Sequence, residues 1–178
     1  MIELLSDFRI QTENYLLRPI VETDITAIYA IHSDDEVNRY LPYQTWQNWA
    51  DAERWYARVL ERRGIAEAAQ FVILRRGRPE LVGTAIAFDY LAESNSIEIG
   101  YVLARANWGQ GVMTEILRAL LPALADRLTL SEFRANVDCE NTASLNLLAK
   151  LGFQTRNVVT QEDGTRSQRL TKTTKTTL

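Results

Sequence analysis

Two glycines stand one residue apart, Gly109 and Gly111, directly before an apolar, helix-like run that reaches Asp126. Glycine destabilises such a position unless the bare backbone is needed, because it loses much conformational freedom on folding. The backbone amides at a helix start have no intrahelical acceptor and lie at the positive end of the helix dipole, so they can bind a phosphate. The pair therefore indicates either an anion site or a tight turn between a strand and a helix.

Two well-known phosphate-binding loops do not fit this spacing. A P-loop requires Lys followed by Ser or Thr after its last glycine, whereas Val112 and Met113 follow Gly111. The dinucleotide-binding fingerprint requires a third Gly or Ala three positions further on, where Thr114 stands. The local pattern alone leaves the anion site and the simple turn open.

Hydrophobic periodicity and turn residues predict the elements that position this turn. Strands are expected at residues 13–20, 70–76, 81–91, 96–104 and 132–138, with two more near the C-terminal end. Asp163 and Gly164 form a dipeptide typical of a hairpin turn and are expected to join those last two strands.

Four helices are expected between these strands. They are one capped by Asp24, one capped by Thr45 that runs through Trp46, Trp49, Tyr56 and Leu60, one after Gly111, and one over residues 141–152. Gly152 is expected to end the last helix in the left-handed conformation. Pro122 lies inside the third helix and is expected to kink it or end it early, because proline removes a backbone hydrogen bond.

The resulting order is β-α-α-β-β-β-α-β-α-β-β. Three consecutive strands joined by short turns predict an antiparallel meander, and the strand–helix–strand unit across the glycine pair predicts one parallel crossover. We therefore expect an α/β fold with a mixed, mostly antiparallel sheet flanked by helices, and one domain over residues 1–178.

Composition narrows the class of protein. The 178 residues are 46 % hydrophobic with a net charge of −3, which suits a globular domain and argues against a broad nucleic-acid-binding surface. No apolar run approaches the roughly 18–20 residues of a membrane span, and the start lacks the pattern of a secretory signal. Cys139 and His32 are each single, which excludes an intrachain disulfide and a Cys/His zinc cluster. These features predict a cytoplasmic protein without a metal, a membrane or a nucleic-acid partner.

The order of several segments resembles the GNAT superfamily of N-acetyltransferases, and within it the group of ribosomal-protein alanine N-acetyltransferases. The similarity covers nearly the whole chain and rests on the ordered set TENYLLRPIVETD, LVGTAIAF, IEIGYVL, NWGQGVMTEIL and NTASLNLLAKLGF. It implies a GNAT-like fold with acetyl-CoA as cosubstrate. The pantetheine arm would lie beside residues 98–103, which include Tyr101, Val102 and Leu103. The pyrophosphate would lie on the backbone of Trp108, Gly109, Gln110, Gly111, Val112 and Met113.

The chain departs from the superfamily pattern at both ends of this glycine loop. Trp108 stands where the pattern usually begins with Gln or Arg, and Met113 stands where it usually ends with Gly or Ala. The long side chain of Met113 either points away from the cofactor or narrows the groove that holds it.

Acetyl transfer to an amine requires an uncharged amine, close approach of its nitrogen to the thioester, and stabilisation or protonation of the leaving thiolate. An α-amino group has a pKa of about 7.7–8.0 and a lysine amine one of about 10.4. A protein N-terminus therefore needs less help from a general base than a lysine does.

The resemblance implies that Glu98, on the strand before the glycine loop, is the general base. The alternative is that Glu98 points to solvent or holds a neighbouring strand. Ser144 is the candidate acid, and it lies with Asn141 on the first turn of a helix where both can face the cofactor. The tyrosine that many members use as the acid is absent, because Leu148 occupies its position. The alternative is that Asn141 only caps the helix and Ser144 only packs.

The acceptor site is the part that the sequence defines least. Tyr40, Tyr43 and Trp46 are candidates to line it, and packing is their alternative role; Trp49 and Tyr56 are expected in the core. His32, Glu162, Asp163 and Cys139 are weaker candidates for chemistry. The acceptor is a protein N-terminal amine or a small-molecule amine, and a non-catalytic module that binds or senses acyl-CoA is the alternative function. The protein is expected to be a monomer or a homodimer.

Overall fold

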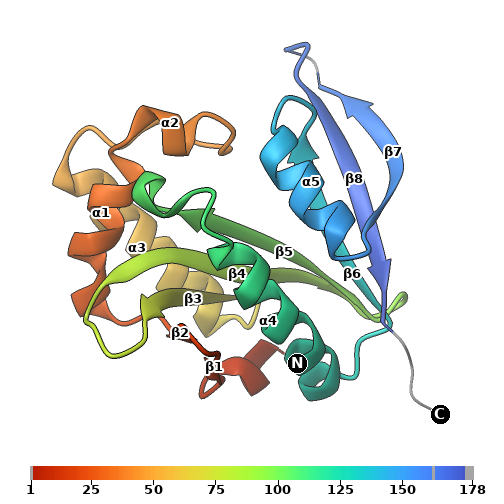
Figure 1. The fold of residues 1–178 in the computed structure, drawn as a ribbon, viewed down its shortest axis with the longest axis horizontal. Coiled ribbons are helices and arrows are strands. Elements are labelled where there is room, and N and C mark those ends of the chain that lie inside the picture. Colours follow the sequence, from red (N-terminus) through yellow and green to blue (C-terminus); the bar gives the residue numbers. More distant parts are fainter. Residues whose placement is uncertain (1, 162, 175–178) are drawn as a thin grey trace.

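The computed structural model describes residues 2–161 and 163–174, and its centre is an eight-stranded sheet (Figure 1). The strands follow the order β1 (Ile10–Gln11), β2 (Tyr15–Pro19), β3 (Ala68–Arg75), β4 (Leu81–Leu91), β5 (Ser96–Leu103), β6 (Glu132–Asp138), β8 (Arg166–Thr173) and β7 (Gln154–Thr160). Of the pairs between these strands, β5–β6 is parallel and the others are antiparallel. The predicted mixed, mostly antiparallel α/β fold is confirmed.

The sheet opens between β5 and β6. The two strands pair only through residues 96–98 with 132–134, although β5 continues to Leu103 and β6 to Asp138. Beyond Glu98 the strands diverge, and β6 stays with β8 and β7 (Figure 1). The far half of β5 therefore pairs with β4 on one edge and leaves its other edge without a strand partner in the described part of the chain.

Helices cover both faces of the central strands. They are α1 (Ile25–His32), α2 (Asp35–Asn38), α3 (Trp49–Gly64), α4 (Val112–Leu128) and α5 (Thr142–Lys150). Alternate residues of β3 belong to different hydrophobic clusters: Phe71 and Ile73 to the cluster that contains α4, and Val72 to the cluster beneath α1 and α3. Because successive side chains of a strand point to opposite faces, α4 and the α1–α3 pair lie on opposite faces of the sheet.

One helix start and one helix cap differ from the prediction. Helix α3 begins at Trp49 and not at Thr45, because the carboxylate of Asp51 accepts hydrogen bonds from the amides of Gln47 and Asn48 and fixes the first turn there. Asp24 does not cap α1 with its side chain. Its carboxylate is taken by Arg18, at 2.7 Å, and by the amide of Val21.

Other local predictions have mixed outcomes. Helix α4 runs through Pro122 to Leu128, so the expected early end is wrong; eight buried apolar side chains hold the helix on the sheet. The left-handed Gly152 after α5 and the β7–β8 hairpin with its left-handed Gly164 are confirmed. The short elements β1 and α2 were not predicted. No helix in residues 2–161 and 163–174 is both long and apolar enough to cross a membrane.

Candidate active site

The glycine loop, residues 108–113, joins the end of β5 to the start of α4. Gly109 and Gly111 have φ angles of 70° and 77°, in the left-handed region that glycine adopts without strain. A Cβ added to either would meet no other heavy atom within 4 Å, so the loop is open above both glycines. Within the described residues, none of the backbone amides of 109–114 donates to a protein acceptor. The loop thus offers free amides and open space to an anion.

The side chains of Trp108, Val112 and Met113 attach the glycine loop to β5 and to the core. The indole Nε1 of Trp108 donates to the carbonyl oxygen of Leu103 at 3.0 Å and ties the loop to the end of β5. The side chains of Val112 and Met113 are 1 % and 4 % exposed and pack in the core under α4. Met113 therefore points away from the loop surface, and only its amide faces outward.

A large central cleft follows the opening between β5 and β6. Its volume is about 1440 Å³, more than the roughly 300–1,000 Å³ of a pocket for one small ligand. Its lining includes residues 98–102 of β5, 135–138 of β6, one face of α3, the start of α5 and the loop 39–45, together with residues of α2, β3, β4 and the β7–β8 hairpin. The glycine loop is not part of this lining, but Trp108 binds the end of the same strand.

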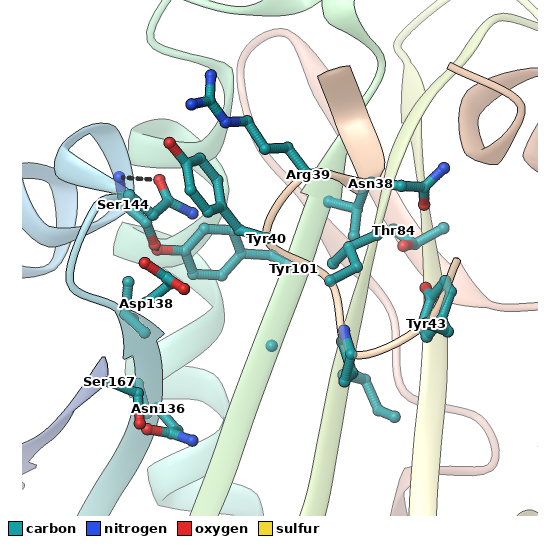
Figure 2. A pocket seen from close by; sticks show the side chains of 18 of the residues that line it. Asn38, Arg39, Tyr40, Tyr43, Thr84, Tyr101, Asn136, Asp138, Ser144 and Ser167 are labelled. Atoms are coloured by element: carbon teal, nitrogen blue, oxygen red, sulfur yellow. Dashed lines mark hydrogen bonds between the residues drawn. The ribbon is translucent and has the colours of Figure 1, made fainter. Parts of the chain in front are cut away.

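Ser144 and Tyr101 meet across this opening. Their hydroxyl oxygens are 2.6 Å apart, and Figure 2 shows Tyr101 extending from β5 toward α5. Burial raises the pKa of Tyr101 to about 12, while the hydrogen bond with Ser144 acts in the opposite direction. The phenol therefore keeps its proton at neutral pH. Leu148 is fully buried, yet a tyrosine hydroxyl reaches Ser144 from the neighbouring strand.

Asn141 has the capping role that the sequence left open. Its side-chain oxygen accepts a hydrogen bond from the amide of Ser144 at 3.1 Å and closes the first turn of α5. Both residues also line the cleft, so capping and a position beside the opening occur together.

Glu98 lies on the other face of β5. Because side chains alternate along a strand, Glu98 faces the α3 side together with its cross-strand partner Phe88, and Tyr101 faces the α4 side. Burial raises the pKa of Glu98, and the charge of Arg134 opposes this rise. An Nη of Arg134 lies 3.4 Å from the carboxylate and also bonds Asp89. Glu98 therefore lines the cleft and also holds β6, the strand beside it.

Two of the three aromatic residues proposed to line the acceptor site, Tyr40 and Tyr43, line the cleft, and Trp46 does not. Tyr40 lines the cleft, and its hydroxyl donates to the carbonyl oxygen of Glu140, at 3.3 Å, in the segment before α5. Tyr43 also lines the cleft, and burial raises the pKa of its hydroxyl. Trp46 is buried in the cluster beneath α1 and α3 and does not line the cleft. Trp49, expected in the core, is 44 % exposed and bonds Glu53.

The weaker candidates lie in different surroundings. His32 is buried outside the cleft lining, and Cys139 is half-buried. Asp163 lines the cleft, but its carboxylate accepts from the amide of Thr165 in the hairpin turn. Glu162 lies outside the described residues. In the described ranges, no group of three or more His, Cys, Asp or Glu side chains is placed to hold a metal ion.

Known proteins resemble this chain in sequence and in fold. A family model described as "Acetyltransferase (GNAT) domain" matches residues 14–154. The uncharacterized N-acetyltransferase YoaA of Bacillus subtilis (strain 168) is 34 % identical over 157 residues, which cover 85 % of this chain and 86 % of that protein.

Two solved structures share the fold at low identity. Mycobacterium smegmatis RimJ in complex with a CoA disulfide matches with a TM-score of 0.82 and 23 % identity over 96 % of this chain and 88 % of that one. Spermidine N-acetyltransferase from Vibrio cholerae, in complex with CoA and spermine, matches with a TM-score of 0.76 and 18 % identity over 89 % and 95 %. These likenesses show the fold, and the names of the relatives do not favour a non-catalytic module.

Proposed function

Because the chain belongs to the GNAT family of N-acetyltransferases, whose cosubstrate is acetyl-CoA, we propose that it transfers an acetyl group to a primary amine, either a protein N-terminal α-amine or a small-molecule amine. The observation that carries this proposal is the opening between β5 and β6. It places a carboxylate, Glu98, on one face of β5 and a hydroxyl pair, Ser144 and Tyr101, on the other. An amine and a thioester entering from opposite faces would meet in that opening.

Acetyl-CoA would lie along β5 and the glycine loop. The unpaired edge of β5 beyond Glu98 offers backbone groups to the amides of the pantetheine arm, as a sheet edge does for an added strand. The free amides of residues 109–114 would hold the diphosphate. Trp108, through its bond to Leu103, keeps these two parts in one orientation.

Glu98 would accept the proton of the amine, directly or through a water molecule. The raised pKa of Glu98 lies closer to neutral pH than that of a free carboxylate, so Glu98 is a stronger base. A stronger base favours proton transfer from an amine. The neutral amine nitrogen then attacks the carbonyl carbon, a C–N bond forms, and the C–S bond breaks with the electron pair going to sulfur. Arg134 holds the carboxylate in place during this step.

Ser144 would stabilise and protonate the leaving thiolate. The phenol of Tyr101 is protonated and can donate to the oxygen of Ser144, so the hydroxyl of Ser144 is free to donate to the sulfur. The thiolate leaves as the thiol of CoA with the proton of Ser144. The first amine proton passes from Glu98 to solvent, and the second proton, which the attacking nitrogen loses as the amide forms, returns through solvent to Ser144. The net reaction converts an amine and acetyl-CoA into an amide and CoA.

A screen of acceptors tests the proposal. The purified protein is incubated with acetyl-CoA and a panel of N-terminal peptides, free amino acids, polyamines and simple alkylamines, and the release of CoA thiol is followed. We expect release that requires an amine and saturates with one class of acceptor. Release at the rate of spontaneous hydrolysis with every amine class would contradict the proposal and leave a binding module.

A further inference from the structure

Loop 39–45 forms one wall of the central cleft, and both of its ends are attached to one buried residue, His32. All seven of its residues line the cleft. The residue before the loop, Asn38, and the residue after it, Trp46, each bond His32. Tyr40 of this loop donates to the carbonyl oxygen of Glu140, in the segment before α5. Figure 2 shows the side chain of Tyr40 on the side of the cleft where Ser144 lies.

Three hydrogen bonds join Asn38 and Trp46 to His32, and a fourth joins Asn38 to Asp34. The amide of Trp46 donates to the carbonyl oxygen of His32 at 2.9 Å. The side-chain nitrogen of Asn38 donates to the same carbonyl and to that of Asp34. The side-chain oxygen of Asn38 lies 3.2 Å from Nδ1 of His32.

These contacts fix the tautomer of the imidazole. Because the nitrogen of Asn38 donates to two carbonyl oxygens, its oxygen must face the ring, and an amide oxygen only accepts. Nδ1 of His32 therefore carries the hydrogen. Nε2 then carries a lone pair and no hydrogen, and it has no hydrogen-bond partner within the described residues. Burial lowers the pKa of His32, which keeps the ring neutral.

The surroundings of the ring are aromatic. His32 is 1 % exposed, and its ring centre lies 4.6 Å from that of Trp46, 5.7 Å from Tyr43 and 6.1 Å from Trp55. An apolar ring would fill this space without burying an unpaired nitrogen. The feature that imidazole adds is the Nδ1 donor aimed at Asn38.

We propose that His32 and Asn38 act as a clamp that sets the shape of loop 39–45, and through Tyr40 and Tyr43 determines how the acceptor amine fits. They are positioning residues and not catalytic ones, because His32 does not line the cleft and the side-chain amide of Asn38, which does line it, is bonded to His32 and Asp34. This inference rests on the proposed function, in which the loop borders the acceptor.

The position of the donor can be varied at residue 32. The side-chain nitrogen of asparagine corresponds to Nδ1 of histidine, that of glutamine corresponds to Nε2, and phenylalanine has no donor. We expect His32→Asn to keep the KM for the acceptor near that of the parent. His32→Gln, His32→Phe and Asn38→Ala should raise it about tenfold or more, because small displacements of a positioning group are costly. The KM for acetyl-CoA should stay within about twofold in all four variants, because residues 108–113, which would hold the diphosphate, do not line the cleft with this loop.

Asn95→Ala is the matched control. Asn95 also ties two segments through a carbonyl, that of Thr129, but it lies outside the cleft lining. It should lower the melting temperature without separating the two KM values. If the variants at positions 32 and 38 lower stability as Asn95→Ala does and leave the acceptor KM unchanged, the two residues are structural and the clamp is refuted.

Limited trypsin digestion tests the clamp without catalysis. Arg39 is exposed and begins the loop. Cleavage after Arg39 should be faster in His32→Phe and Asn38→Ala than in the parent and in Asn95→Ala. Equal cleavage rates in all four would overturn the clamp even if no amine acceptor is found, whereas faster cleavage in a protein that acetylates nothing would contradict only the proposed function.

Discussion

Replacing Gly111 by alanine distinguishes a phosphate-binding loop from a simple turn. At φ 77° an L residue is strained by roughly 1–2 kcal/mol, and the new Cβ would meet no protein atom within 4 Å. For a domain of this size, each 1 kcal/mol shifts the melting temperature by roughly 2–4 °C. We therefore expect a modest loss of stability without acetyl-CoA.

The loss of affinity for acetyl-CoA should be larger than this strain. The Cβ would occupy the space through which a diphosphate approaches the amides of residues 109–114. A hydrogen bond to a charged group contributes about 1.5–3 kcal/mol, so losing one corresponds to roughly 10- to 100-fold weaker binding. Isothermal titration of acetyl-CoA into the variant measures this directly.

Gly77→Ala is the matched control for this experiment. Gly77 has a φ of 75° in the turn between β3 and β4, and a Cβ there would also meet nothing within 4 Å. It should show a similar loss of stability with unchanged affinity for acetyl-CoA. If Gly111→Ala binds acetyl-CoA as tightly as Gly77→Ala, the reasoning about the glycine loop is refuted.

Three further predictions concern ionisable groups and hydroxyls. Glu98→Gln should lower turnover by about 10² to 10⁴ at low pH and recover as pH rises toward the pKa of the acceptor, and a pH–rate profile parallel to that of the parent would remove Glu98 as base. Ser144→Ala should lower kcat about tenfold with little dependence on the pKa of the acceptor, and Tyr101→Phe should act in the same direction but less, whereas parent-like kcat in both would leave the thiolate to solvent. Because burial lowers the pKa of His32 from 6.5 in the folded protein, the unfolded chain binds the extra proton first, so this group reduces stability as pH falls below about 6.5. Urea unfolding of the parent should show that slope and His32→Asn should not; equal slopes would mean that the folded imidazole titrates normally.

The sequence predicted the parts of the fold that depend on local patterns. The meander, the parallel crossover and the left-handed Gly152 follow from alternation, from a strand–helix–strand unit and from one glycine. The start of α3 was placed at Thr45 because threonine is a good cap, but Asp51 takes the two amides that decide where the helix begins. These bonds span only three and four residues, so Asn48 followed by Asp51 is a local capping-box signal that the choice of Thr45 missed.

In the candidate site, the sequence predicted the local features and missed a contact between residues far apart in the chain. Spacing identified Gly109 and Gly111, whose conformation is local. The bond between Tyr101 and Ser144 joins residues 43 positions apart, and no short-range pattern encodes it. The sequence shows Leu148 where many family members have a tyrosine, and it gives no sign that the hydroxyl of Tyr101 reaches Ser144 from β5.

The attachment of loop 39–45 to His32 is likewise absent from the sequence signal. It needs a carbonyl that accepts from both Asn38 and Trp46, and backbone carbonyls are the same in every residue. The sequence made His32 only a weaker candidate for chemistry, and it gave no sign that the ring bonds Asn38, the residue before the loop.

The most direct test of the central claim is identification of the product by mass spectrometry. The parent and the double variant Glu98→Gln/Ser144→Ala are incubated with acetyl-CoA and an acceptor from the screen, at equal saturation with acetyl-CoA. At a pH well below the pKa of the acceptor, we expect one acetyl group on the amine nitrogen with the parent and only the background level with the double variant. A double variant that acetylates the amine as fast as the parent would contradict the claim that the groups on the two faces of β5 carry the reaction.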